Sequence, residues 1–155
     1  MSNSICISFE DEPPGCIPLK KVEEFILSVL TDLKHTNWDI SVLFCRDAFI
    51  KNLNKQYRGI DSPTDVLSFE QGDEYFDETG ETRFSAGDIV ISIETLALNS
   101  KEFNVEKNEE LKRLLIHGIL HLSGMDHADN SPEQEMLQLQ EKLLSSYKNT
   151  VIYAE

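Results

Sequence analysis

Basic side chains are scarce in this 155-residue sequence, in which 14 Lys and Arg stand against 28 Asp and Glu and leave a formal net charge of −14. A field of that sign repels nucleic acids and anionic membranes at long range. Broad electrostatic binding to either is therefore excluded, and any function on RNA requires a local exception to the overall charge.

Long apolar runs are also absent, since no window approaches the ~20 residues that cross a bilayer. The first residues, MSNSICISFEDEPP, have neither the basic start nor the apolar stretch of a secretory signal, so we expect a cytoplasmic protein. The three cysteines, Cys6, Cys16 and Cys45, lack the close spacing of a zinc knuckle or a redox pair and are predicted to be reduced thiols.

No repeat, linker or change in composition divides the chain, so we expect one domain over residues 1–155. Alternating apolar residues predict four strands, and apolar residues three and four positions apart predict five helices. Ser131 is the predicted N-cap of the last helix, and Pro132 its first residue. The expected strands lie at about 5–9, 38–45, 65–69 and 87–92, and the expected helices at about 22–33, 49–57, 94–103, 107–122 and 132–147.

An acidic stretch without a single Lys or Arg lies between the third and fourth predicted strands. A run of like charge is most simply explained by solvation, so we expect a loop there. Its acidic residues are Glu70, Asp73, Glu74, Asp77, Glu78 and Glu81.

Histidine is rare but clustered, because three of the four histidines lie in HGILHLSGMDH, residues 117–127. On a helix, His117 and His121 lie one turn apart on the same face and can direct their imidazole nitrogens at one point. Gly124 permits a backbone turn, with φ above zero, that brings His127 to the same point. The spacing predicts a site for one divalent metal ion, with burial in the core as the alternative. The fourth histidine, His35, is expected to be an ordinary hydrogen-bonded residue.

Three neutral imidazoles leave a coordination position open for water, which is typical of catalytic rather than structural zinc. Zinc lowers the pKa of such a water from about 16 to roughly 7 and polarises phosphoryl or carbonyl oxygens, so the pattern favours hydrolysis. In zincin peptidases a Glu follows the first histidine as general base, but here that position is Gly118. Asp126 could orient an imidazole or accept a proton from the water, and equally it could be a turn residue.

The segment HGILHLSGMDH resembles the signature of the YbeY family of bacterial endoribonucleases. Two further blocks, NKQYRGIDSPTDVLSF at 54–69 and GDIVIS at 87–92, are similar to that family's other motifs in order and spacing. The resemblance implies an α+β fold with a mixed four-stranded sheet and about five helices, the metal site lying on a central helix and the turn after it. It also implies a single-strand-specific, metal-dependent endoribonuclease that acts in ribosomal RNA maturation, at the 3′ end of 16S rRNA, and in ribosome quality control.

By position, the resemblance places the metal ligands on His117, His121 and His127 and the functional arginine on Arg58. The expected ion is zinc, with nickel or another divalent ion as alternatives. Arg58 suits the chemistry, because a planar guanidinium holds a phosphate through two hydrogen bonds and offsets charge that grows in the transition state.

Arg58 is also expected to belong to a small positive patch near the metal, together with Arg46, Lys51 and Lys55. With so few positive charges, binding to naked RNA is expected to be weak and sensitive to salt. The expected partners are therefore single-stranded or ribosomal RNA and the ribosomal small-subunit proteins that deliver it.

Two other functions stay open on the sequence alone. The histidine spacing equals that of metzincin peptidases, which allows a metal-dependent peptidase or amidase, although Gly118 removes the usual general base. A non-enzymatic ribosome assembly factor with a structural metal is the second alternative. Cleavage of RNA or of unfolded protein, with and without a chelator, distinguishes these functions.

Overall fold

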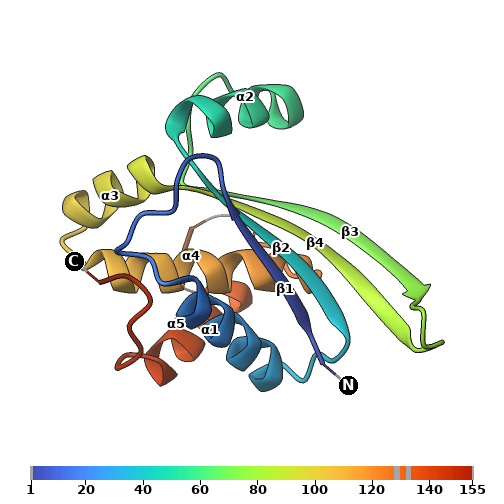
Figure 1. Ribbon diagram of the computed structural model, residues 1–155. Helices are drawn as coiled ribbons and strands as arrows, with labels where there is room; N and C mark the ends of the chain where they lie inside the picture. The colour runs from blue at the N-terminus through green and yellow to red at the C-terminus, as the bar shows by residue number, and fades with distance from the viewer. Residues whose placement is uncertain (1, 128–129, 132–133, 155) are drawn as a thin grey trace.

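The protein is built on a four-stranded sheet with the order β1-β2-β4-β3, seen in a computed structural model that describes residues 2–127, 130–131 and 134–154 (Figure 1). β1, β2 and β4 run parallel to one another, and β3 pairs antiparallel with β4 at the edge. The strands are β1 (Ser4–Phe9), β2 (Trp38–Cys45), β3 (Val66–Phe76) and β4 (Thr82–Ser92).

Five helices complete the described part of the chain, so the expected α+β fold with a mixed four-stranded sheet is confirmed. None of these helices is long and apolar enough to cross a membrane. The helices are α1 (Leu19–Asp32), α2 (Asp47–Arg58), α3 (Ile93–Glu102), α4 (Lys107–Leu122) and α5 (Glu135–Ser146).

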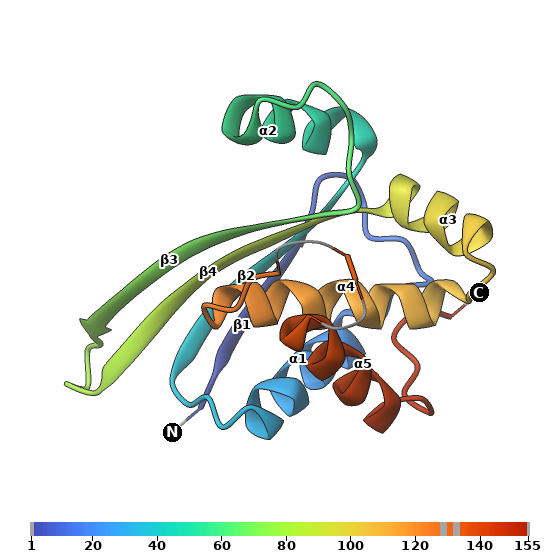
Figure 2. The ribbon, with the colours of Figure 1, turned by 180° about the vertical axis from the view of Figure 1, so that it is seen from behind.

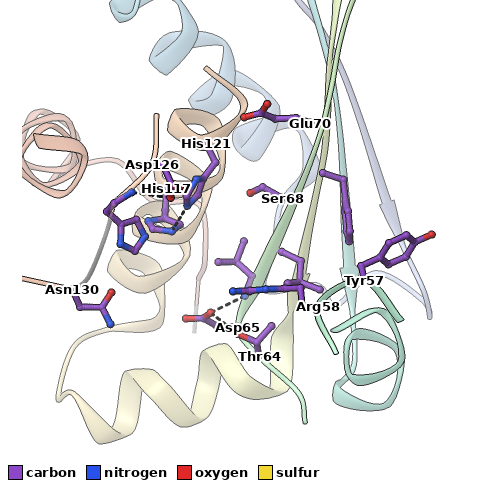
Figure 3. Close-up of a pocket in the computed structure, with 14 residues that line it drawn as sticks. Tyr57, Arg58, Thr64, Asp65, Ser68, Glu70, His117, His121, Asp126 and Asn130 are labelled. Carbon is purple, nitrogen blue, oxygen red and sulfur yellow. Dashed lines mark hydrogen bonds between the residues drawn. The ribbon is translucent and has the colours of Figure 1, made fainter. Parts of the chain in front are cut away.

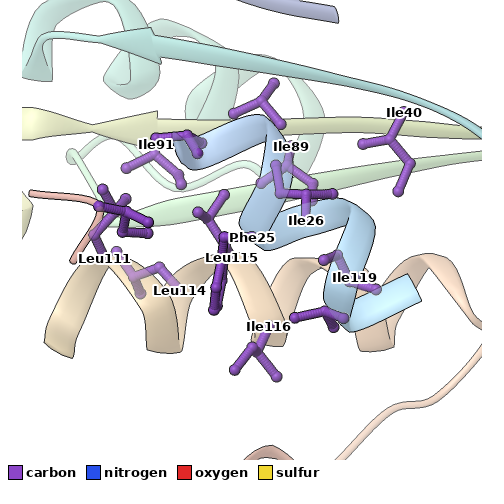
Figure 4. Close-up of a cluster of buried hydrophobic side chains, with 14 of the residues drawn as sticks. Phe25, Ile26, Ile40, Ile89, Ile91, Leu111, Leu114, Leu115, Ile116 and Ile119 are labelled. Atoms are coloured by element: carbon purple, nitrogen blue, oxygen red, sulfur yellow. The ribbon is translucent and has the colours of Figure 1, made fainter. Parts of the chain in front are cut away.

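Helix α4 lies in the middle of the main core. Figure 2 shows α1, α4 and α5 together on one side of the sheet, and Figure 4 shows Ile89 of β4 among Leu115 of α4 and Phe25 of α1. All three of these side chains are at most 2% exposed. Because each fully buried large apolar side chain contributes about 1.5–3 kcal/mol, α4 is a firmly held support for whatever its polar face carries.

A second, smaller core lies between α2 and the opposite face of the sheet. Ile50 of α2 packs there with Leu67 of β3 and Val90 of β4. This contact fixes α2 beyond the carboxyl end of β2, at the top of Figure 1, and so determines where the last residue of α2, Arg58, lies.

Two glycines allow close approaches between elements. A Cβ at Gly118 would lie 2.9 to 3.0 Å from carbons of Ile89, so the absence of a side chain lets α4 rest directly on β4. Gly87 has φ +142°, and a Cβ there would lie 2.1 Å from the carbonyl oxygen of Phe69. Only glycine combines this backbone conformation with so close a neighbouring strand.

The acidic stretch is a β-hairpin, and the expectation of a loop is wrong. β3 continues to Phe76 and β4 begins at Thr82. Asp77 closes the turn, because its Oδ1 accepts hydrogen bonds from the backbone N–H groups of Thr79 (2.9 Å) and Glu81 (3.0 Å). Figure 2 shows this end of the hairpin extending beyond the helices. Residues 70–76 of β3 are exposed on both faces of the strand, and no alternation of apolar residues marks them in the sequence.

The start of α5 also differs from the expectation. The helix begins at Glu135 with Gln134 at the N-cap position, so the predicted cap at Ser131 is wrong. Pro132 lies outside the described residues. The apolar face is as expected, since Met136 and Leu143 are buried.

Candidate metal centre

His117, His121 and His127 converge on one point, as their spacing predicts. One possible ligand atom from each side chain lies within 4.8 Å of those of the other two. The Nε2 atoms of His117 and His121, one turn apart on α4, are 3.0 Å from each other. Two nitrogens that share a tetrahedral zinc at 2.0–2.1 Å lie roughly 3.3 Å apart, so the observed separation is close to that of a shared ion.

The turn after α4 explains how the third histidine returns to the helix. Met125 N–H donates to Leu120 O at 3.1 Å and Gly124 N–H donates to His121 O at 2.9 Å, which together form a Schellman motif. Gly124 has φ +92°, as this motif requires, so the expectation of a left-handed residue here is confirmed. The motif ends the helix at Leu122, with Ser123 as its C-cap, and directs the chain toward His127.

The hydrogen bonds of the imidazoles decide which ring nitrogens are available. Nδ1 of His121 lies 3.1 Å from the carbonyl oxygen of Met125, and Nδ1 of His117 lies 2.7 Å from Oε1 of Gln140. Both partners are acceptors, so both Nδ1 atoms carry the ring proton and both Nε2 atoms carry a lone pair. Two lone pairs 3.0 Å apart repel each other unless a cation lies between them, so these residues fit a metal ion.

Burial keeps these rings neutral. Burial lowers the pKa of His117, and the nearby His121 and His127 lower it further, although the hydrogen bond that His117 donates to Gln140 raises it. Burial is also the main cause that lowers the pKa of His121. A neutral imidazole is the form that binds metals, so the site is prepared for a cation near neutral pH.

The histidines line a cavity of about 880 Å³ that is also bounded by α2 and β3. Figure 3 shows His117 and His121 on one side and Arg58 reaching into the cavity from the other. We call the first side the histidine wall and the second the arginine wall. The histidine wall consists of His117, His121 and His127, and the arginine wall of Arg58, Thr64 and Asp65.

Arg58 is the one member of the predicted positive patch among the described residues that line this cavity. It is exposed, and it forms no ion pair with any residue in the described part of the chain. Arg46 is instead paired with Asp11 at 2.6 Å, and Lys51 lies 4.0 Å from Asp61. The catalytic role of Arg58 stays a prediction, but its side chain is placed where an anion beside the histidines would meet it.

Asp126, the candidate orienting group or base, lines the same cavity. Its Oδ1 accepts a hydrogen bond from the backbone N–H of His127 at 2.8 Å, as a turn residue would. The carboxylate is also exposed to the cavity, so a role as orienting group or base stays a prediction.

Two polar residues near the site were not identified from the sequence. Asp65 on the arginine wall accepts hydrogen bonds from Val66 N–H (2.8 Å) and from Asn99 Nδ2 (3.2 Å). Gln140 of α5 contacts His117 and is 6% exposed. The available signal for Gln140 is its position in the apolar stripe of α5, four residues after Met136, where a polar side chain requires a buried partner.

Comparisons with known proteins agree with the family resemblance that the three sequence blocks indicate. A family model described as Endoribonuclease YbeY matches residues 11–148. A curated relative named Endoribonuclease YbeY from Treponema denticola is 73% identical over 153 residues, which cover 99% of this chain and 99% of the relative. Another, from Treponema pallidum (strain Nichols), is 54% identical over 146 residues, which cover 94% of this chain and 90% of the relative.

A solved structure agrees with the fold. The solution structure of a Thermotoga maritima protein superposes with a TM-score of 0.62 at 30% sequence identity, covering 91% of this chain and 87% of that one. The family match spans most of the length and includes the histidine segment, Arg58 and the glycine-containing strand β4. The chain therefore belongs to the Endoribonuclease YbeY family.

Proposed function

We propose that residues 1–155 form a single metal-dependent hydrolase domain that cleaves single-stranded RNA between the histidine wall and the arginine wall. As a member of its family the chain is an endoribonuclease of ribosomal RNA maturation, and the ion, the residue roles and the 16S 3′ end as target are our proposal. The observation that carries it is the distance of 3.0 Å between the Nε2 atoms of His117 and His121, at the edge of a cavity that an arginine enters.

His117, His121 and His127 would hold one divalent ion, which we take to be zinc because three imidazoles suit a borderline-soft cation. When bound, such an ion supplies a Lewis acid and a water molecule of lowered pKa. Gln140 and Met125 hold two of the rings in the metal-binding tautomer, so the site needs little rearrangement to bind it.

Arg58 would bind the scissile phosphate. Its guanidinium can donate two parallel hydrogen bonds to the non-bridging oxygens and offset the negative charge that grows on them. Asp65 is held by three donors, from Thr64, Val66 and Asn99, so its carboxylate can accept a hydrogen bond from a ribose hydroxyl without moving. The phosphate must enter a cavity lined by half-buried histidines, which an unpaired, bendable strand does more easily than a duplex.

The charge of the protein indicates how the substrate arrives. A net charge of −14 repels RNA at long range. Arg58 is the one residue of the predicted positive patch among the described residues that line the cavity. Affinity for naked RNA should therefore be weak and fall with salt. We propose that ribosomal small-subunit proteins, which would contact the acidic surface, bring the RNA to the site. Cleavage of the same RNA should then be faster in a small-subunit particle than in free form.

The test uses the purified full-length chain, its metal content measured by elemental analysis, on RNA that carries the unprocessed 3′ end of 16S rRNA. We expect cleavage in single-stranded segments, loss of cleavage with a chelator, and recovery with zinc. A matched duplex and an unfolded protein serve as control substrates. Cleavage that persists in the fully chelated protein, or cleavage of the protein substrate alone, would contradict the proposal.

The product ends then separate two routes of attack. A 2′,3′-cyclic phosphate means that the ribose hydroxyl attacks, whereas a 5′-phosphate means that water attacks. The peptidase alternative has no structural support, because Gly118 occupies the position of the zincin base and lies against Ile89.

A further inference from the structure

Gln140 is a buried polar residue, and both the oxygen and the nitrogen of its side-chain amide have hydrogen-bond partners. It lies on α5 between Met136 and Leu143, which are buried in the core, and it is itself 6% exposed. Its Oε1 accepts from Nδ1 of His117 at 2.7 Å, and its Nε2 donates to Oε2 of Glu141 at 3.1 Å. A buried amide that only filled space would be replaced at lower cost by an apolar side chain.

The neighbouring ion pair determines which way the amide faces. Glu141 can only accept hydrogen bonds, so it selects the Nε2 side of Gln140 and leaves Oε1 for His117. Arg113 fixes Glu141 in turn, donating from Nε at 3.0 Å and from Nη2 at 3.1 Å. Burial alone raises the pKa of Glu141, but its hydrogen bonds to Arg113 and Gln140 outweigh this and lower the pKa. Glu141 therefore remains a carboxylate.

The chain of contacts begins and ends on the same helix. Arg113 lies one turn before His117 on α4, and Gln140 and Glu141 are adjacent on α5. The two helices are thus joined by a polar link, and one end of that link is a metal-binding imidazole. If the amide were reversed, Nδ1 of His117 would have to accept, and the ring proton would move to Nε2, where a metal must bind.

We propose that Gln140 is a positioning residue of the metal centre, which holds His117 in the tautomer and rotation that direct Nε2 at the cation. This inference rests on the proposed metal-dependent function. Hydrogen-bond partners of metal-bound histidines typically change metal affinity by about 10- to 100-fold when they are removed. We expect that range here, because His117 keeps its place on α4 but loses the group that orients its ring.

The test compares three variants of the full-length chain for zinc and cobalt affinity, measured by competition with a chromophoric chelator. Gln140→Leu removes the acceptor in a site already lined by apolar residues, and we expect affinity to fall about 10- to 100-fold. The double variant Gln140→Glu with Glu141→Gln keeps an acceptor for Nδ1 of His117 and a donor between the two neighbouring side chains, so it should bind as the wild type does or more tightly. Gln138→Leu makes the same change at an exposed position of α5 and should have no effect.

Two readouts separate positioning from general stability. The visible absorption of the cobalt form should change in Gln140→Leu and be restored in the double variant Gln140→Glu with Glu141→Gln. In the wild-type protein without metal, ¹⁵N NMR of the histidine rings should show His117 protonated at Nδ1, a measurement that does not depend on any variant folding.

Three outcomes would each overturn the role of Gln140 while leaving the metal site intact. They are wild-type affinity in Gln140→Leu, an equal loss of affinity in Gln140→Leu and in the double variant, and a wild-type His117 protonated at Nε2. A wild-type chain that binds neither zinc nor cobalt would overturn the proposed function and this inference together.

Discussion

The two walls of the cavity differ in how their functional side chains are held. On the histidine wall, the rings of His117 and His121 are anchored through Nδ1 to groups of the protein, and their helix is packed into the main core. On the arginine wall, Arg58 ends a surface helix and has no ion pair among the described residues. Under the proposed function, we therefore expect a metal site that is formed in advance and an arginine that obtains its partner only when a phosphate arrives.

Removing a ligand should have the largest effect. In His121→Ala the zinc content should fall well below one ion per chain and the rate of RNA cleavage by at least about 1,000-fold, because a metal supplies several kcal/mol of transition-state stabilisation. His35→Gln is the matched control, since His35 bonds Ser123 and stacks on Trp38 away from the cavity. A His121→Ala variant that keeps both zinc and activity would show that the histidine wall does not hold the metal.

Arg58→Ala should lower the rate of cleavage by about 100- to 1,000-fold, the usual cost of losing one group that stabilises transition-state charge. The melting temperature should not change, because Arg58 is exposed and remote from the core. Zinc affinity should not fall, because the positive charge of Arg58 disfavours a second positive charge at His121. Lys55→Ala, at an exposed position one turn earlier on α2, is the control. Zinc loss in Arg58→Ala would mean that the arginine wall belongs to the metal site rather than facing it.

Gly118→Ala tests whether the histidine wall is as rigid as its packing indicates. The added Cβ would meet the buried side chain of Ile89, and overpacking of this kind costs about 1–3 kcal/mol. Alanine gains roughly 1 kcal/mol in a helix, so the net loss in the free energy of unfolding should be about 0–2 kcal/mol by urea denaturation. Gly15→Ala, with no atom near its Cβ, should cause no loss. A gain of about 1 kcal/mol in Gly118→Ala, the full helix-propensity effect without any packing cost, would show that α4 moves freely against β4.

Acid should produce the smallest effect, to which His117 and His121 of the histidine wall contribute together with His35, whose pKa is also lowered by burial. Burial lowers the pKa of His117 and His121 below the ordinary value of 6.5 in the folded, metal-free chain. The unfolded chain then binds more protons as the pH falls through 6.5, so the free energy of unfolding decreases in that window and is fully retained above it. Replacing both histidines with Gln should reduce this pH dependence. If the free energy of unfolding of this variant depends on pH as that of the wild type does, the effect belongs to other titratable groups.

Local patterns in the sequence were sufficient to predict how the residues of the histidine wall come together. His117 and His121 are four residues apart on a helix, and Gly124 marks the turn that returns His127. Each of these relations depends on neighbours in the chain, so helical periodicity and turn chemistry predict them.

The remaining features depend on contacts that the sequence does not display. The partner of Gln140 is His117, 23 positions earlier, and nothing in either segment identifies the other. The distal part of β3 is exposed on both faces, so pairing of its backbone with β4 forms it without an apolar pattern. The signal that could have indicated it was the turn chemistry of Asp77, Thr79 and Gly80.

Gly118 also limits the reactions that this scaffold can acquire by mutation. The residue after the first histidine is where a glutamate would turn the same three imidazoles into a peptidase, yet here that position faces the inside of the protein, against Ile89. A carboxylate introduced there would be buried without a partner before it could reach a water molecule. One tightly packed contact between a helix and a strand thus separates two enzyme classes that share a ligand spacing, and single substitutions are not expected to cross between them.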